Sequence, residues 1–261
     1  MTPILLLGAG RMGGALVAGW RRANAFPMSS LIIRDPSPGP AARTSGANLA
    51  PSRDDLLSAR TVVLAVKPQI WRDAAAEVAD DLAPDAVIVS VAAGVATADI
   101  ASAFGGRRVA RVMPTTAAAI GQGTASVYAA DPEGRARAHA LLGPVGAVVD
   151  LADEDLMHAA TAVSGSAPAY LYAFVEALQA AGESLGLPAD AARQLARATT
   201  AGAAALMAES GEDAAELRRQ VTSPAGTTEA ALNVLLGERG LTPLLKAAAA
   251  AAEQRSRELG R

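Results

Sequence analysis

The stretch Gly8-Ala9-Gly10-Arg11-Met12-Gly13 constrains the fold of this chain more than any other. It follows a short apolar run at residues 4–7 and precedes an apolar run with helical spacing. A strand, a tight glycine turn and a helix are the context in which a G-x-G-x-x-G fingerprint binds a dinucleotide. In that fingerprint Gly8 permits the turn, Gly10 lets the backbone approach a pyrophosphate, and Gly13 lets the helix pack close to the sheet. The phosphates would meet free N–H groups at the positive end of the helix dipole. We therefore predict a nucleotide site here, with a glycine turn that holds no ligand as the alternative.

A second apolar run, at residues 31–34, predicts a strand that ends at Asp35, about 20 residues beyond the glycine motif, where the fingerprint expects an acid. A carboxylate at this position usually binds the ribose hydroxyls of NAD and repels a 2′-phosphate, whereas a neighbouring arginine favours NADP. Arg34 stands directly beside Asp35, and Arg53 could also reach a phosphate. The residues themselves therefore leave the choice between NAD and NADP open.

The first half of the chain alternates predicted strands and helices. Continuous apolar runs of this kind are typical of parallel strands buried on both faces. The further strands are expected at residues 61–66, 86–91, 109–113, 124–128 and 147–149, with helices at 70–82, 97–104 and 133–142. This alternation predicts an α/β fold, a Rossmann-type doubly wound parallel sheet. Ligands in such sheets collect at the carboxyl ends of the strands.

The pattern changes near residue 153, after which nearly every segment has helical spacing and is rich in alanine. Helices are predicted at 154–162, 167–185, 189–209, 214–220, 227–236 and 242–259. We therefore predict two domains, a dinucleotide-binding domain at 1–153 and an all-helical domain at 154–261. Because an alanine-rich helical domain buries little volume within one chain, we expect it to pack against a second copy.

Composition excludes several classes of function. The net charge of −3 argues against nucleic acid or an anionic membrane as a partner. No stretch approaches the roughly 20 apolar residues of a membrane span, and the apolar N-terminus lacks the basic residues of a signal peptide. The absence of cysteine excludes disulfides and thiol nucleophiles and fits a reducing, cytoplasmic compartment. No metal-ligand spacing is present, so we expect no metal.

Two loops of the second half could carry chemistry. In the first, residues 164–168, Ser164 or Ser166 could cap a long helix and Pro168 suits its first turn. In the second, residues 221–229, hydroxyl side chains surround a Pro-Ala-Gly turn at the start of an apolar helix. The free N–H groups of that helix would suit a carboxylate or a phosphate. Capped turns without a ligand remain the alternative for both loops.

At these loops the sequence resembles the pyrroline-5-carboxylate reductases, the last enzymes of proline biosynthesis. The matching segments follow the family order and cover nearly the whole chain: residues 8–13, 65–68, 91–94, 111–114, 161–170 and 221–232. The resemblance implies NAD(P)H-dependent reduction of the cyclic imine 1-pyrroline-5-carboxylate to L-proline, with NADP(H) as the usual cofactor and NAD(H) accepted. It also implies an all-helical dimerisation domain that forms homodimers, which in this family often assemble into larger rings.

The resemblance further assigns site residues by position. It implies substrate binding by Ser223, Gly226, Thr227 and Thr228, with Thr228 and Ser223 as the catalytic pair and the Thr228 hydroxyl near the ring nitrogen. The cofactor residues, including those expected from the fingerprint, are Gly8, Ala9, Gly10, Arg11, Met12, Arg34, Asp35, Arg53, Ala65, Val66, Lys67, Pro68, Val91, Ala92, Ala93, Met113 and Pro114. Hydride transfer to a protonated imine needs no strong general acid, which fits the lack of an obvious histidine or lysine catalyst.

Several positions depart from the family pattern, and one of them is Asp35, which is unusual for a reductase that favours NADPH. Thr115 and Ala117 stand where asparagine and proline are usual, and Ala167 and Ala225 each replace a usual glycine. The two alanines require backbone conformations that alanine tolerates. These departures leave cofactor preference and catalytic efficiency open.

Two other functions are alternatives to the reductase. A β-hydroxyacid dehydrogenase, or another imine reductase of related architecture, is the rival enzyme. The hydroxyacid class normally needs a lysine on its first long C-terminal helix, and residues 167–185 contain none. A nucleotide-sensing module without catalysis is the rival of another class.

Overall fold

The computed structural model describes residues 1–259. It separates into two compact units, one formed by residues 1–165 with the end of the chain from residue 251, and one formed by residues 166–250. The predicted second domain extends to residue 261, and its last two residues lie outside the described part. No helix among the described residues is both long and apolar enough to cross a membrane.

The first unit contains a seven-stranded sheet with the order β2-β1-β3-β4-β5-β6-β7. The strands are β1 (Ile4–Leu7), β2 (Leu31–Arg34), β3 (Thr61–Leu64), β4 (Val87–Ser90), β5 (Val109–Pro114), β6 (Gly123–Ala129) and β7 (Gly146–Asp150). All seven predicted strands are thereby confirmed, although those expected to reach residues 66 and 91 stop at Leu64 and Ser90. Beyond these ends the chain leaves the sheet and lines a cleft, with Ala65, Val66 and Val91 on its wall.

The parallel sheet predicted from the alternation of strands and helices is confirmed for the first five strands, and the last two strands add one antiparallel pairing. Strands β1 to β5 are parallel, but β6 runs antiparallel to β5, and β7 is parallel to β6. A parallel connection needs a crossover of a dozen residues or more, usually a helix. Only residues 115–122 join β5 to β6, so the chain reverses direction there.

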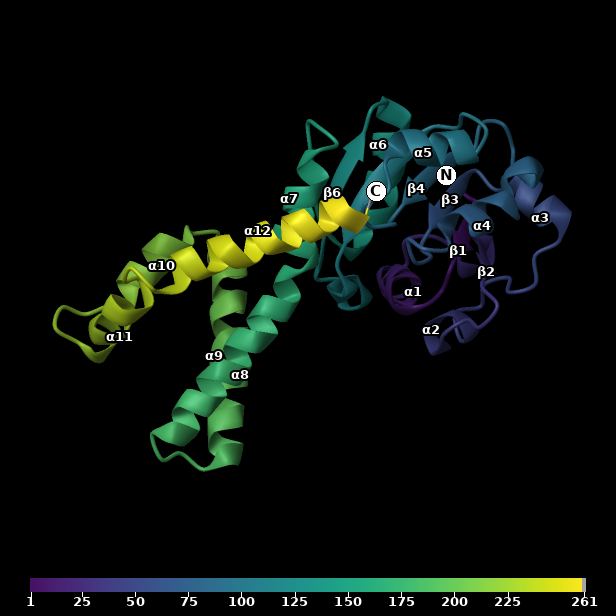
Figure 1. The fold of residues 1–261 in the computed structure, drawn as a ribbon. Helices are drawn as coiled ribbons and strands as arrows, with labels where there is room; N and C mark the ends of the chain where they lie inside the picture. Colours follow the sequence, from purple (N-terminus) through teal and green to yellow (C-terminus); the bar gives the residue numbers. More distant parts are fainter. Residues whose placement is uncertain (260–261) are drawn as a thin grey trace. The chain divides into compact units, whose positions relative to one another are not determined.

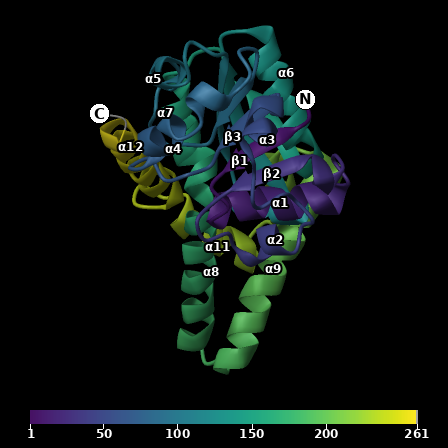
Figure 2. The same cartoon turned by 90° about the vertical axis from the view of Figure 1, so that its right-hand side faces the viewer.

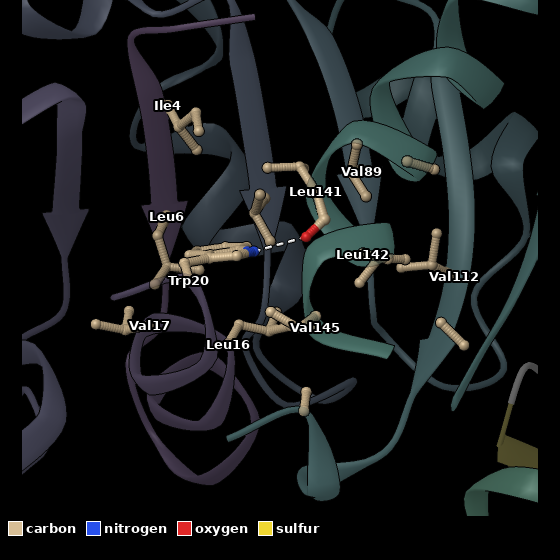
Figure 3. Packing of buried hydrophobic residues seen from close by; sticks show 14 of the residues in the cluster. Ile4, Leu6, Leu16, Val17, Trp20, Val89, Val112, Leu141, Leu142 and Val145 are labelled. Carbon is tan, nitrogen blue, oxygen red and sulfur yellow. Dashed lines mark hydrogen bonds between the residues drawn. The ribbon is translucent and has the colours of Figure 1, made fainter. Parts of the chain in front are cut away.

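Helices cover both faces of this sheet. They are α1 (Arg11–Ala23), α2 (Pro40–Arg43), α3 (Arg53–Ser58), α4 (Trp71–Ala76), α5 (Thr97–Ala103), α6 (Pro132–Leu142) and α7 (Leu156–Ala160). Alternate strand residues point to opposite faces, so Leu6 joins one apolar cluster with α1 and α6, while Leu5 joins the other with α3, α4 and α5. In the first cluster the buried Trp20 indole N–H donates to the carbonyl of Leu141 at 2.7 Å, which ties α1 to α6 (Figure 3).

Two predicted helices of this unit are shorter than expected. The helix predicted at 70–82 ends at Ala76 and is followed by a 3₁₀ turn at Ala79–Asp81, in which the Asp81 N–H donates to the Val78 carbonyl. This tighter turn lets Val78 and Leu82 bury their side chains in the second apolar cluster. The helix predicted at 154–162 becomes α7 followed by a π-helical turn at Thr161–Gly165.

The second unit is helical, as predicted. Its helices are α8 (Ala167–Ser184), α9 (Ala189–Ser210), α10 (Ala214–Gln220), α11 (Thr227–Leu235) and the first part of α12 (Leu241–Leu259). In both views α8 and α9 lie side by side as an antiparallel hairpin (Figures 1 and 2). Pro168 lies in the first turn of α8, as expected.

The serine expected at the N-cap of α8 is there, but the hydrogen bond by which a serine side chain caps a helix is missing. Ser166 holds the N-cap position, but its side chain makes no capping hydrogen bond. The hydroxyl of Ser164 donates instead to the carbonyl of Ala160 at 2.8 Å, inside the π-helical turn that precedes α8. Because the preceding turn is already helical, the chain enters α8 without the extended N-cap residue that a serine cap requires.

Candidate functional site

A cleft of about 690 Å³ opens at the carboxyl ends of β1, β2 and β3. The strand order changes direction between β1 and β3, and open α/β sheets bind ligands at such a switch point. The cleft is lined by Leu7, Gly8, Gly10, Arg11, Met12, Arg34, Asp35, Pro36, Ala65, Val66, Lys67, Ile70, Asp73, Ala74, Glu77 and Val91. Its volume suits a small-molecule or cofactor site.

Gly8 and Gly13 have the structural roles that the sequence predicts, and the approach of a pyrophosphate to Gly10 stays a prediction. Gly8 has a φ of +90°, and a Cβ there would lie 2.8 Å from the Ala65 carbonyl oxygen. A Cβ on Gly13 would overlap the carbonyl oxygen of Gly8, so α1 can pack this closely only without a side chain. A Cβ on Gly10 would meet nothing within 4 Å and would project into open space at the cleft. The first turn of α1 has no side-chain cap, so its N–H groups are free for an anion. A pyrophosphate fits this arrangement.

The charged side chains at the end of β2, which line the cleft, already form hydrogen bonds within the protein. One carboxylate oxygen of Asp35 accepts the Ala9 N–H at 2.5 Å, and the other accepts the Ser37 N–H at 2.7 Å. Asp35 therefore fixes the glycine loop to the end of β2. Its neighbour Arg34 donates through Nε and Nη2 to a single oxygen of Glu77, at 3.2 and 3.0 Å.

The structure brings most of the predicted cofactor residues to this one cleft. The predicted residues that line it are Gly8, Gly10, Arg11, Met12, Arg34, Asp35, Ala65, Val66, Lys67 and Val91. The others do not line it: Ala9, Arg53, Pro68, Ala92, Ala93, Met113 and Pro114. Ala9 and Ala92 are buried, and Arg53 pairs with Asp81 at 2.7 Å.

The sequence reasoning missed one wall of the cleft. Ile70, Asp73, Ala74 and Glu77 come from α4 and the residues that flank it. Their spacing of three, four and seven residues places them on one face of a helix. That spacing, directly after the Lys67-Pro68 end of a strand, was the available signal.

The predicted substrate residues lie at the start of α11, in the second unit. Gly226 is the N-cap of α11 and no side chain caps it. Within residues 1–259, no hydrogen bond is recorded for the hydroxyls of Ser223, Thr227 or Thr228, whereas the Glu229 carboxylate accepts the Ala225 N–H at 2.7 Å. The turn thus presents unengaged hydroxyls beside the free N–H groups of a helix N-terminus.

Three of the positions that depart from the family pattern differ in how the structure accommodates them. Ala225 has a φ of +56°, in the left-handed region that favours glycine, so the requirement for a backbone conformation that alanine tolerates well is not met at this position. Ala167, by contrast, is the first residue of α8 and needs no unusual backbone angle. Thr115 is buried, and its hydroxyl oxygen accepts the Thr124 N–H at 3.1 Å.

The two histidines lie outside the cleft lining. His139 Nε2 lies 3.0 Å from a carboxylate oxygen of Asp150, and His158 Nδ1 lies 2.9 Å from the Ser256 hydroxyl. Burial, together with the positive charges of Arg111 and Arg257, lowers the pKa of His158. Residues 1–259 contain no group of three or more His, Asp or Glu side chains arranged to hold a metal ion.

Comparison with known proteins places the chain in a family. It is 39% identical to the pyrroline-5-carboxylate reductase of Pseudomonas aeruginosa over 267 residues, which cover 99% of this chain and 97% of that one. The chain belongs to the pyrroline-5-carboxylate reductase family. Residues 154–259 match the family model for pyrroline-5-carboxylate reductase dimerisation, and residues 3–94 match the model for NADP oxidoreductase, coenzyme F420-dependent. Membership makes the chain an oxidoreductase of the nicotinamide-dependent type, as predicted.

Solved structures agree with this assignment. The pyrroline-5-carboxylate reductase of Coxiella burnetii is 32% identical, with a TM-score of 0.90, and the similarity covers 100% of this chain and 99% of that one. The pyrroline carboxylate reductase of Plasmodium falciparum, whose structure contains NADP, has a TM-score of 0.85 at 24% identity and covers 100% and 98% of the two chains. The Rossmann-like sheet followed by a helical dimerisation domain is therefore the fold of the family.

Proposed function

We propose that this protein reduces 1-pyrroline-5-carboxylate to L-proline, the last step of proline biosynthesis, with NADPH as the preferred cofactor and NADH as an alternative. The observation that carries the proposal is the similarity to pyrroline-5-carboxylate reductases along the whole chain. The cleft of the first unit and the polar turn before α11 supply the two kinds of site that this reaction needs.

The residues of the cleft would hold the cofactor. The free N–H groups at residues 10–12 suit its pyrophosphate, and the small side chains after β3 and β4 leave room for flat rings. When bound, the dihydronicotinamide supplies the hydride that the C=N carbon accepts. The remaining cofactor residues inferred from the family stay part of this proposal.

The start of α11 would hold the substrate. The N–H groups of Thr227 and Thr228 suit the carboxylate, and the Gly226 N-cap leaves them open. The Thr228 hydroxyl would contact the ring nitrogen, and Ser223 would orient the same group. Solvent supplies the proton of the imine, so the chain's task is to position the ring.

We further propose that the functional division of the chain lies between residues 153 and 154, and that the helical part forms a homodimer that can assemble into a ring. The dimerisation match begins at residue 154. The lack of cysteine is compatible with the cytoplasm as the working compartment. Nucleic acid and membranes are not expected as partners at a net charge of −3.

The test is an assay of NADPH and NADH oxidation with 1-pyrroline-5-carboxylate, with L-proline identified as the product. We expect proline to form in proportion to the cofactor oxidised, and faster with NADPH. Tight binding of the cofactor without oxidation would instead favour a nucleotide-sensing module. Oxidation only with a β-hydroxyacid or keto-acid pair would favour the dehydrogenase class.

A further inference from the structure

The ion pair between Arg34 and Glu77 lines the cleft, and hydride transfer does not require it. Arg34 is the last residue of β2, where an arginine that binds the 2′-phosphate of NADP is found in dinucleotide-binding folds. Both Nε and Nη2 of Arg34 donate to Oε2 of Glu77, which follows α4 on the opposite wall. Both side chains line the cleft and are partly open to solvent, at 40% and 59%. The arginine best placed for a 2′-phosphate therefore already has an anionic partner.

The negative charges around this pair weaken the binding of NADP(H) relative to that of NAD(H). Asp35, Asp73 and Glu77 line the same cleft as Arg34. A phosphate monoester carries close to two negative charges at neutral pH, so a 2′-phosphate here faces carboxylates as well as the guanidinium. A ribose hydroxyl faces no such repulsion. Asp35 accepts two backbone N–H groups, and a carboxylate has further lone pairs with which it can accept a hydroxyl.

We propose that Glu77 determines cofactor specificity by competing with the 2′-phosphate of NADP(H) for Arg34. This inference rests on the proposed function only in that it takes the cleft to bind a nicotinamide dinucleotide. With NAD(H), the Arg34–Glu77 pair stays intact. With NADP(H), the guanidinium must leave Glu77 or share its donors between two anions. Because an exposed ion pair is weak, Glu77 reduces the preference for NADP severalfold and does not abolish NADP binding.

The experiment measures the binding of NADP⁺ and NAD⁺ by isothermal titration calorimetry without any substrate. Glu77→Gln keeps the size of the side chain and removes its charge. We expect the Kd for NADP⁺ to fall roughly three- to tenfold, since Arg34 is released and one repulsive charge is lost. The Kd for NAD⁺ should stay within about twofold of the wild-type value.

Two further variants separate competition for Arg34 from a general effect of charge. Asp85→Asn removes the same charge from the Arg60–Asp85 pair, which has a similar separation of 2.9 Å and similar exposure but does not line the cleft. We expect it to change neither Kd. In an Arg34→Met background, NADP⁺ should bind more weakly, and the addition of Glu77→Gln should no longer tighten its binding. Thermal melting of each variant checks that the fold is kept.

Three results would overturn the inference: equal tightening of NAD⁺ and NADP⁺ in Glu77→Gln, the same gain in Asp85→Asn, or an undiminished gain in the Arg34→Met background. A wild-type protein that binds both dinucleotides while Glu77→Gln changes nothing rejects this inference and leaves the reductase proposal standing. A wild-type protein that binds neither dinucleotide rejects both.

Discussion

At the scale of single residues, the two parts of the proposed site are built differently. The glycine fingerprint depends on the absence of side chains. A Cβ on Gly8 or Gly13 would collide with backbone atoms, and a Cβ on Gly10 would project into the cleft. The turn before α11 works by presenting groups, because the hydroxyls of Ser223, Thr227 and Thr228 make no hydrogen bond within residues 1–259 and no side chain caps the N–H groups at the start of the helix. Function at this scale depends on individual atoms, so single substitutions can test it.

Thr228→Ala should lower turnover far more than it weakens NADPH binding. Loss of a hydrogen bond to a charged group costs about 1.5–3 kcal/mol, so we expect kcat to fall roughly tenfold to a hundredfold. Steady-state kinetics measure the change, and NADPH titration measures the binding. Thr222→Ala is the matched control, because the Thr222 hydroxyl donates to the Arg218 carbonyl at 2.6 Å and belongs to the preceding helix end. Unchanged turnover in Thr228→Ala would remove this hydroxyl from the mechanism.

Ala225→Gly should stabilise the protein. The φ of +56° at Ala225 strains an L-residue by about 1–2 kcal/mol, and the extra freedom of glycine in the unfolded chain offsets part of the gain. We expect the free energy of unfolding to rise by about 0.5–1 kcal/mol, measured by urea denaturation. Ala167→Gly, in the first turn of α8, should instead be neutral or lower it by up to about 1 kcal/mol. A loss of stability in Ala225→Gly would contradict the strained conformation.

At the scale of elements, polar contacts join the end of α12 to α7. The Arg257 guanidinium donates to both carboxylate oxygens of Asp155, at 2.5 and 2.9 Å. The hydroxyl of the buried Ser256 is hydrogen-bonded to Nδ1 of His158. The residue before Asp155, Glu154, accepts hydrogen bonds from the buried Arg111 of β5 and from the N–H and hydroxyl of Thr97. These contacts fix the last turns of the chain to the sheet.

The contact of His158 should make stability depend on pH. Burial, Arg111 and Arg257 lower the pKa of His158 below its ordinary value of 6.5, although Asp155 and Glu253 oppose the shift. Below that ordinary value the unfolded chain binds more protons than the folded one. The stabilisation by neutral His158 is therefore complete above pH 6.5 and is lost as the pH falls below it.

Urea denaturation between about pH 7.5 and about pH 5.5 measures this dependence. His158→Asn should be less stable at the higher pH and should lose part of the slope across that window. His139→Asn is the control, because His139 lies on α6 and contacts Asp150 instead. An identical slope in wild type and His158→Asn would show that another group titrates.

At the scale of the whole molecule, the hairpin of α8 and α9 leaves apolar side chains exposed in a single chain. No residue of α8 is buried, and Leu171 and Tyr172 are 58% and 67% exposed. Exposed apolar side chains gathered on one surface mark an interaction site. Together with the dimerisation match, this favours a second copy of the chain as the partner of the hairpin.

Leu171→Glu should dissociate the proposed dimer. A charge placed in an apolar interface without a partner costs several kcal/mol, enough to shift the mass to that of one chain at micromolar concentration. Sedimentation velocity measures the mass. Leu57→Glu is the control, since Leu57 is similarly exposed at 55% but lies on α3. A dimer that survives Leu171→Glu with unchanged affinity would place the interface elsewhere.

The sequence by itself determined the strands, the helical second half and the position of the cleft that we propose to bind the nucleotide. Glycines at fixed spacing after a strand, apolar runs and helical periodicity are local patterns, and each depends on neighbouring residues of the chain. They led correctly to the seven strands, the helical second half and ten of the residues that line the cleft.

Only the tertiary structure decided which side chains compete within the cleft and which way the last strands run. Arg34 and Glu77 are 43 residues apart, and nothing local connects them until the sheet forms. The direction of β6 is that of its antiparallel pairing with β5, and the positive φ of Ala225 belongs to the turn before α11. These features depend on contacts that the folded chain creates, so local patterns do not contain them.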